Sequence, residues 1–291
     1  MKFIENNFLE CKITNRGAEL CSLVDKATGM EYIWQKKPEI WNSTSPVLFP
    51  SIGNIKNNAI VHNQTAYNMP KHGFVRNNTN LTFSKQKPSK CTFTLINSTQ
   101  TKKWYPFDFK FEIDYELIQN RLIMSYHIQN TGQEPMYYNC GGHTAYSCPL
   151  EGELNLSDYS IEFPDLKQLK SNTIGPSGLI SDSIRDIILD HGFLTLNESM
   201  FLEDALIFKN IGTNWVRLHH TKSNKKLKIS FEDYPHLALW SKPKADYVCI
   251  EPWLGLPDHM HTATEISKNI SYKKLNPSCI QTYRIITEVE S

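Results

Sequence analysis

The chain has 291 residues, of which 40% are hydrophobic, 11% aromatic and 21% charged, and its formal net charge is +1 at pH 7. This composition allows a sizeable core and excludes an intrinsically disordered chain. The balanced charge gives no general electrostatic basis for binding nucleic acid or an acidic membrane surface, and no stretch approaches the roughly 20 apolar residues that span a bilayer.

The cysteines and the N-terminal residues favour a cytoplasmic protein. The seven cysteines are odd in number, widely spaced and never arranged as C-x-x-C, so they indicate neither a disulfide framework nor a zinc ribbon. We expect buried free thiols in a reducing compartment. Glu5 interrupts the N-terminal stretch before an apolar segment of signal-peptide length develops.

The first strong strand signals lie between residues 91 and 128. Cys91–Ile96 is rich in β-branched and aromatic residues. Every second residue is apolar from Phe107 to Leu117, and the same alternation returns from Leu122 to Ile128 after a polar break at residues 119–121. A period of two is typical of a strand with one buried and one solvated face, so these two segments predict a β-hairpin.

Helical periodicity is scarce in this sequence. The best candidate is Ser181–Leu189, where Ile184, Ile187 and Ile188 would share one face of a short helix.

Further strands are expected in the C-terminal part. Trp215–Leu218 and Leu227–Phe231 flank a polar segment and predict a second hairpin, and Tyr247–Ile250 and Ile280–Thr287 are also rich in strand-forming residues. Neither a linker-like cluster nor an internal repeat is visible. We therefore predict a single domain over residues 1–291 with an all-β fold, a large antiparallel β-sandwich.

Three segments carry residue types suited to chemistry. Met69–Arg76 holds a histidine between a lysine and a glycine, and Asn139–Tyr146 holds a glycine pair directly before His143. Such glycines allow a tight turn or a close approach of another chain segment. Cys249–Asp258 places a lone Glu251 at the end of an apolar strand run. Taken singly, each has a structural alternative: a surface histidine or arginine, or a glutamate that marks where a strand meets solvent.

Taken together, these segments resemble the aldose 1-epimerase (galactose mutarotase) family, and within it the LacX-type branch. The resemblance extends over most of the chain as an ordered set of short sequence words. These are Gly17–Leu20, Gly29–Trp34, Trp41, Ser45–Pro50, Met69–Arg76, Gly141–His143, Asp204–Phe208, Leu239–Ser241 and Glu251–Trp253. The resemblance implies a galactose mutarotase-like supersandwich and an isomerase that interconverts sugar anomers.

The resemblance also implies the roles of three residues. Opening a pyranose ring requires a proton to leave the anomeric hydroxyl while the ring oxygen receives one. By resemblance, Glu251 is the general base and His143 the general acid, and His72 hydrogen-bonds the sugar near its ring oxygen or assists as a second proton donor. An ionised carboxylate and a protonated imidazole suit these roles near neutral pH.

Substrate-binding residues follow from the same resemblance. Arg76 and Asp204 would bind sugar hydroxyls, because charged groups form the stronger hydrogen bonds. Trp240 and Trp253 would form walls for the apolar face of the sugar, and burial in the core is the alternative for both.

One position departs from the pattern of the branch. Relatives often carry an arginine after the glycine of the segment that matches residues 49–54, whereas this chain has Asn54. The change removes a cation from the expected mouth of the site. It weakens a phosphosugar interpretation, although Lys71 and Arg76 could still meet a phosphate.

Neither a metal nor a cofactor is expected. His259 and His261 are two residues apart without further nearby ligands, so we expect a structural or exposed role for both. The sequence contains no glycine-rich phosphate loop, dinucleotide fingerprint or serine nucleophile elbow.

The function predicted from these observations is that of an aldose 1-epimerase acting on a small-molecule sugar, in a monomer or homodimer. Two alternatives stay open, a hexose-6-phosphate 1-epimerase and a non-catalytic carbohydrate-binding protein on the same fold. A glycoside hydrolase is disfavoured, because that chemistry generally requires two carboxylates around the scissile bond.

Overall fold

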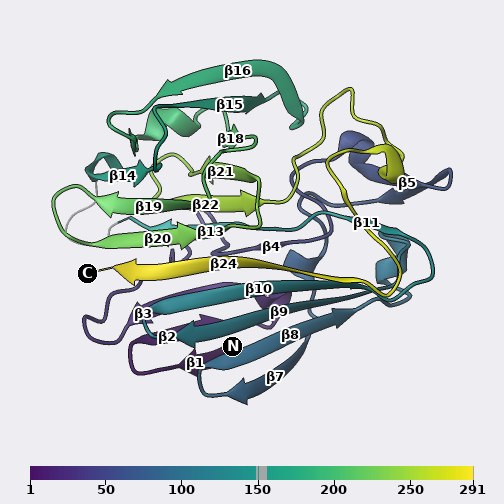
Figure 1. The fold of residues 1–291 in the computed structure, drawn as a ribbon, viewed down its shortest axis with the longest axis horizontal. Coiled ribbons are helices and arrows are strands. Elements are labelled where there is room, and N and C mark those ends of the chain that lie inside the picture. Colours follow the sequence, from purple (N-terminus) through teal and green to yellow (C-terminus); the bar gives the residue numbers. More distant parts are fainter. Residues whose placement is uncertain (149, 151–155, 291) are drawn as a thin grey trace.

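The computed structural model describes residues 1–148, 150 and 156–290, and its regular structure is dominated by β-strands (Figure 1). Two large antiparallel sheets, of nine and eight strands, form the body of the molecule. In the described residues the helical segments are short 3₁₀ turns, at Arg16–Ala18, Lys56–Asn58, Val75–Asn77, Thr101–Lys103, Leu156–Asp158, Glu198–Phe201 and Ile266–Lys268. The predicted all-β antiparallel sandwich is confirmed.

The nine-stranded sheet contains both predicted hairpins. Its strands in spatial order are β17 (Phe193–Thr195), β14 (Tyr159–Glu162), β19 (Trp215–His220), β20 (Lys226–Ser230), β24 (Ile280–Glu290), β10 (Arg121–Asn130), β9 (Phe109–Ile118), β8 (Lys90–Ile96) and β7 (Thr82–Lys87). The β9–β10 and β19–β20 pairs are antiparallel neighbours, as predicted. The β-rich segments at residues 91–96 and 280–287 lie in β8 and β24.

The eight-stranded sheet carries the segments with candidate chemistry. Its strands in spatial order are β16 (Ile180–Ile188), β15 (Gln168–Ile174), β18 (Leu206–Phe208), β21 (His236–Trp240), β22 (Tyr247–Trp253), β12 (Gly141–Gly142) and β4 (Val47–Leu48), with β13 (Thr144–Ser147) also paired to β22. The smaller sheets are β1 (Lys2–Glu5), β2 (Leu9–Ile13) and β3 (Leu20–Asp25); β11 (Met136–Tyr138) with β23 (Lys273–Leu275); and β5 (Ala59–His62) with β6 (Thr65–Asn68).

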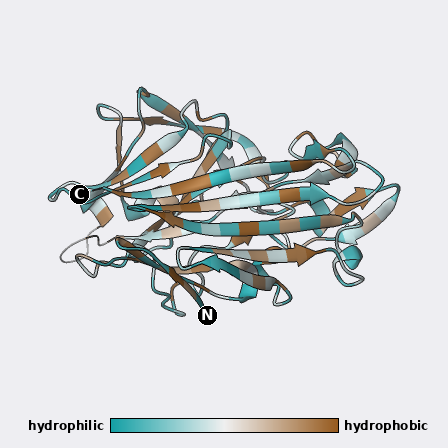
Figure 2. Ribbon diagram, turned by 60° about the horizontal axis from the view of Figure 1, so that its bottom comes forward, coloured by the Kyte–Doolittle hydropathy of each residue, from teal (hydrophilic) through white to brown (hydrophobic). Residues whose placement is uncertain are grey.

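The core lies between the two large sheets. Along β9, buried and partly exposed residues alternate, so Phe109, Phe111 and Ile113 are buried while Lys110, Glu112 and Asp114 are partly exposed. Figure 2 shows hydrophobic and hydrophilic colours alternating along the long strands. The sheets meet directly where the Tyr146 hydroxyl lies 2.7 Å from the Thr287 hydroxyl, joining β13 to β24. The period-two pattern therefore buries one face of each long strand against the opposite sheet.

The predicted helix at Ser181–Leu189 is wrong, because all of these residues except Leu189 belong to strand β16, which pairs with β15. β16 lies at the edge of the eight-stranded sheet, and Ile184 and Ile188 are 58% and 73% exposed. A nine-residue segment is too short for periodicity to separate the two structures, and β-branched isoleucines favour strands.

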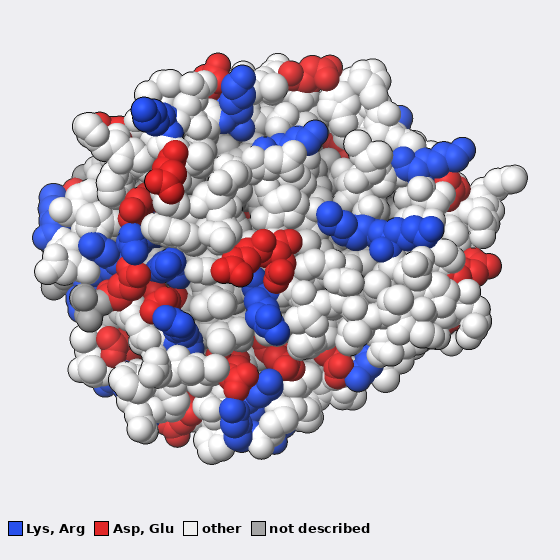
Figure 3. Space-filling model, viewed as in Figure 1, with Lys and Arg blue, Asp and Glu red and all other residues white. Residues whose placement is uncertain are grey.

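The structure also bears on the expectations about the cysteines, membrane-spanning segments and surface charge. All seven cysteines are free thiols, and all but the exposed Cys279 are buried. Among the described residues, no helix has the length and hydropathy needed to cross a membrane. Basic and acidic side chains are interspersed on the face seen in Figure 3. A single domain over residues 1–291 stays a prediction.

Candidate active site

A cleft of about 1030 Å³ opens over the eight-stranded sheet. All eight residues predicted to form the site line it: Asn54, His72, Arg76, His143, Asp204, Trp240, Glu251 and Trp253, of which Trp253 is also buried. They come from distant parts of the chain, so the tertiary fold brings together every residue that the sequence analysis selected.

Glu251 lies within the buried strand β22. Every residue of this strand is buried, and Glu251 is only 1% exposed. The expectation that Glu251 marks the point where a strand run ends is therefore wrong, because the strand continues through Trp253. β22 pairs with β21 through the Ala238–Glu251 register, which fixes the backbone that carries the carboxylate.

His143 is held beside Glu251 by the glycine pair that precedes it. It lies between β12 and β13, and both of these strands pair with β22. A Cβ atom at Gly141 would lie 2.8 Å from the Pro252 carbonyl oxygen, and one at Gly142 would lie 2.7 Å from Ile285 Cδ1. The predicted close approach at this glycine pair is thus confirmed, and it brings the imidazole to the base of the cleft.

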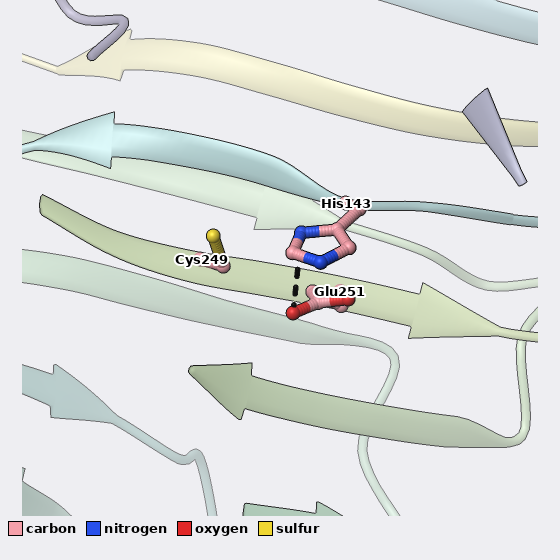
Figure 4. A group of neighbouring side chains, drawn as sticks. All are labelled: His143, Cys249 and Glu251. Carbon is pink, nitrogen blue, oxygen red and sulfur yellow. Dashed lines mark ion pairs between the residues drawn. The ribbon is translucent and has the colours of Figure 1, made fainter. Parts of the chain in front are cut away.

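The His143 and Glu251 side chains meet directly. His143 Nδ1 lies 3.3 Å from Glu251 Oε1, as the dashed line in Figure 4 shows. Neither His143 Nδ1 nor Glu251 Oε2 has a well-aligned hydrogen bond to another described residue. Buried polar atoms are normally paired, so these two atoms are exceptions that call for an explanation.

Burial opposes charge on both members of this pair. Desolvation raises the pKa of Glu251 well above its ordinary value, with Lys71 and Arg76 acting in the opposite direction. Desolvation, aided by Arg76 and Lys71, lowers the pKa of His143 to about 3. The 3.3 Å separation would suit an ion pair, but burial is the largest influence on both pKa values and it favours the neutral carboxyl and the neutral imidazole.

His72 is fixed in a strained turn next to His143. Its φ is +65°, and Gly73 follows with a φ of +74° where a Cβ would lie 2.1 Å from the Phe49 carbonyl oxygen. The Gly53 backbone N–H donates to His72 Nδ1 over 3.1 Å. Burial lowers the pKa of His72 and so favours its neutral ring, and because Nδ1 accepts from the Gly53 N–H, the proton of that neutral ring lies on Nε2. The His72 and His143 ring centroids are 5.4 Å apart.

Aromatic rings enclose His143 on two sides. Trp41 is stacked on its imidazole with a centroid distance of 5.2 Å, and Trp240 meets it edge-on at 5.7 Å. In the sequence, Trp41 stands out only as part of the family resemblance. Its position against a residue far away in the chain has no local sequence signal.

The cleft also contains charged and polar groups from its rim. Within the described residues, neither Lys71 nor Arg76 forms an ion pair, although Arg76 is only partly exposed. Asp204 is exposed, and its Oδ1 accepts a hydrogen bond from the Ala205 N–H. Asn54 Nδ2 donates to the Gly178 carbonyl oxygen over 3.3 Å, so this side chain braces the turn between β15 and β16.

The histidine pair at residues 259 and 261 has a different place. His259 Nε2 lies 3.0 Å from Asp182 Oδ1, and its Nδ1 accepts a hydrogen bond from the His261 N–H. Neither histidine lines the cleft.

Comparisons with known proteins agree with this architecture. The sequence profile described as aldose 1-epimerase matches residues 3–268. The plasmid-encoded protein LacX of Lactococcus lactis subsp. lactis is 30% identical over 284 residues, which cover 94% of each chain.

Solved structures give the same result. A galactose mutarotase related enzyme from Lactobacillus acidophilus has a TM-score of 0.92 at 28% identity, with 100% of this chain and 97% of that chain covered. A galactose mutarotase-like protein from Lactobacillus casei also has a TM-score of 0.92, at 27% identity and full coverage of both chains. The fold is that of the galactose mutarotase-like proteins. The chain belongs to the aldose 1-epimerase family.

Proposed function

We propose that this protein is an aldose 1-epimerase that interconverts the α and β anomers of free aldohexoses. The observation that carries the proposal is the contact between His143 Nδ1 and Glu251 Oε1, 3.3 Å apart at the base of an open cleft. Membership of the aldose 1-epimerase family supports the isomerase class.

The proposed reaction is a paired proton transfer at one bond system. Glu251 removes the proton of the anomeric hydroxyl, the bond between C1 and the ring oxygen breaks, and His143 gives a proton to that oxygen. After rotation about the C1–C2 bond, the hydroxyl attacks the other face of the aldehyde and both protons return. General acid and base groups placed in this way typically contribute about 10²–10⁴-fold to a rate.

The His143–Glu251 pair carries one proton in either of two arrangements. With Glu251 protonated and His143 neutral, the pair contains no buried charge; with the proton on His143, the pair is ready for the proposed reaction. A sugar hydroxyl that donates to Glu251 and a ring oxygen that accepts from His143 stabilise the second arrangement, because hydrogen bonds to a charged form favour it. Lys71 and Arg76 also favour the Glu251 carboxylate.

The neighbouring residues have complementary roles in this proposal. His72 acts as a neutral donor through Nε2 towards the ring oxygen, because its Nδ1 is already an acceptor. Arg76 and Asp204 bind hydroxyl groups, Asn54 supports the rim of the cleft through Gly178, and Trp240 forms an apolar wall.

The test is the rate at which a freshly dissolved pure anomer equilibrates, followed by polarimetry or NMR over several hexoses. We expect acceleration by the wild type and a loss of about 10²-fold or more for His143→Asn, which removes the proposed acid while keeping a small polar side chain. Equilibration no faster than the buffer blank for every sugar would contradict the proposal. Sugar binding without acceleration would instead support a non-catalytic carbohydrate-binding protein.

A hexose-6-phosphate 1-epimerase is the second candidate, and the unpaired cations Lys71 and Arg76 favour it. A phosphate on the substrate would supply the anionic partner that both lack in the described structure. The comparison is kcat/KM for glucose and glucose 6-phosphate in the wild type and in Lys71→Ala, with Lys274→Ala on β23 as the control. A selective loss for the phosphorylated sugar in Lys71→Ala supports this candidate; equal effects on both sugars contradict it.

A further inference from the structure

A thiol adjoins the His143–Glu251 pair and has no role in the proposed reaction. Cys249 precedes Glu251 by two residues on β22, so the two side chains lie on the same face of the strand, next to His143 (Figure 4). One ligand atom from each of the three residues lies within 4.8 Å of the other two. All three side chains are buried.

Two of these three groups have a buried polar atom without a well-aligned hydrogen bond. These atoms are His143 Nδ1, whose nearest ionisable neighbour is Glu251 Oε1 at 3.3 Å, and Glu251 Oε2, and β22 holds Cys249 and Glu251 in register with both neighbouring strands. Unpaired buried acceptors on a rigid support indicate a ligand that accepts their electron pairs.

We propose that His143, Cys249 and Glu251 bind a borderline-soft divalent cation, Zn²⁺ or Cd²⁺, at the base of the cleft and that this cation blocks the proton-transfer pair. The binding half of this proposal stands on geometry alone. The inhibitory half rests on the proposed epimerase function.

The donor set and its spacing fit such a cation. Zinc binds thiolate, imidazole and carboxylate with four ligands in a tetrahedron, which places ligand atoms about 3.5 Å apart. The widest separation therefore has to close by roughly 1 Å, a shift within reach of side-chain rotation. The fourth position would face the cleft and take water. Mg²⁺ and Ca²⁺ prefer all-oxygen sites, so they fit this set poorly.

Charge neutrality lowers the free-energy cost of binding a cation at this buried position. A thiolate and a carboxylate together cancel the two positive charges, and the neutral imidazole adds none. The assembled site carries no net charge, which limits the cost of burial and the repulsion from Lys71 and Arg76 in the same cleft.

The bound cation would stop the proposed reaction. It would occupy the lone pairs with which Glu251 accepts the hydroxyl proton and on which His143 carries its own proton. Sugar could still enter the cleft, but neither proton transfer could proceed.

The binding half is tested by titrating Cd²⁺ into the full chain in a reductant that does not bind metals, and following the ultraviolet charge-transfer absorption of a cadmium–thiolate bond. We expect one equivalent to bind to the wild type. Cys249→Ala should lose the band and bind at least about tenfold more weakly, whereas Cys91→Ala, which removes a buried thiol from β8 in the other sheet, should behave as the wild type. No band in the wild type, or equal binding by Cys249→Ala, would overturn the site.

The inhibitory half is tested with Zn²⁺ in the anomerisation assay, with Mg²⁺ as the control cation. We expect Zn²⁺ to slow the wild type and to have at least about tenfold less potency on Cys249→Ala, whose metal-free rate should equal that of the wild type. If Cys249→Ala does not fold, Cys249→Ser, which keeps the side-chain size, takes its place. Equal inhibition of both proteins would overturn the role of Cys249. A wild type that never accelerates anomerisation would refute the proposed function, while the cadmium titration would still decide the site.

Discussion

The two large sheets differ in the burial and hydrogen bonding of their polar side chains. On the outer face of the nine-stranded sheet, Lys90 on β8 lies 3.2 Å from both Asp114 and Glu116 on β9, and Thr94 donates to Glu112 over 2.9 Å. In the eight-stranded sheet, the His143–Glu251 pair is buried with incomplete hydrogen bonding. One sheet satisfies its charges in contact with solvent, and the other keeps charge-bearing groups in a place that opposes their ionisation.

This difference distinguishes polar groups that support the fold from polar groups that serve a site. Ion pairs at a solvated face add little to the free energy of unfolding. Burying ionisable groups with incomplete hydrogen bonding opposes folding, and such groups cluster at functional sites.

The largest expected effect is on activity in the eight-stranded sheet. Glu251→Gln should lower kcat/KM for anomerisation by about 10²–10⁴-fold, because the amide cannot accept the hydroxyl proton. Its free energy of unfolding should equal or exceed that of the wild type, since the amide removes an ionisable group whose burial is unfavourable. Polarimetry and urea denaturation measure the two quantities. A parallel loss of stability would show that Glu251 supports the fold as well.

The largest effect on stability is expected in the nine-stranded sheet. Phe111 on β9 is fully buried and stacks on Phe49 with a centroid distance of 4.6 Å. Phe111→Ala should lower the free energy of unfolding by about 3–5 kcal/mol, because it removes this contact and leaves a cavity. Phe83→Ala, on the edge strand β7, is the matched control and should cost less. The reverse order, measured by urea denaturation, would contradict this account of the core.

The pH dependence should be broader than that of ordinary glutamate and histidine. The active pair carries one proton, so kcat/KM falls below the lower and above the higher of its two apparent pKa values. Burial lowers the first, that of His143, to about 3 and raises the second, that of Glu251. Activity should therefore persist above pH 6.5 and fall tenfold per pH unit only above the raised pKa of Glu251.

Anomerisation rates from pH 5 upwards, corrected for the buffer blank at each pH, measure this profile. A tenfold fall per unit that begins near pH 6.5 would show that His143 titrates with its ordinary pKa of about 6.5.

The smallest effect is expected at the solvated charges. Lys90→Ala should change the free energy of unfolding by about 1 kcal/mol or less and leave kcat/KM unchanged, because partly exposed ion pairs contribute little. Added salt should reduce the difference further. A larger loss in urea denaturation would mean that the charges on β8 and β9 act as a cooperative network.

The local sequence pattern predicted the positions of the strands better than it predicted which side chains are buried. The alternation that gave the β9–β10 hairpin lies within each strand, and it follows directly from burying one face. Helical periodicity was misleading at Ser181–Leu189, where β16 is an edge strand with exposed isoleucines. Glu251 was expected at a strand end, because the continuous burial of β22 on both faces leaves no alternation to read.

Site residues followed a similar division. Family resemblance selected His143 and Glu251, and the cleft brings them together. Trp41 and Cys249 escaped a functional interpretation because their significance depends on contact with His143, which is distant from both in the chain. In the sequence, the only indication was that Cys249 and Glu251 are two residues apart on one strand, which places both side chains on one face. This spacing predicts a metal site only when a third ligand is known to lie beside it.

The sequence by itself determined that this chain forms antiparallel β-structure, because the alternation of apolar and polar residues is a property of neighbouring residues. It also determined the family, through words that occur in a set order. The tertiary structure alone decided that eight dispersed residues share one cleft and that Glu251 and His143 are buried there in contact. Burial and long-range contact set the pKa values and leave lone pairs unused, and neither is a property of any local stretch of sequence.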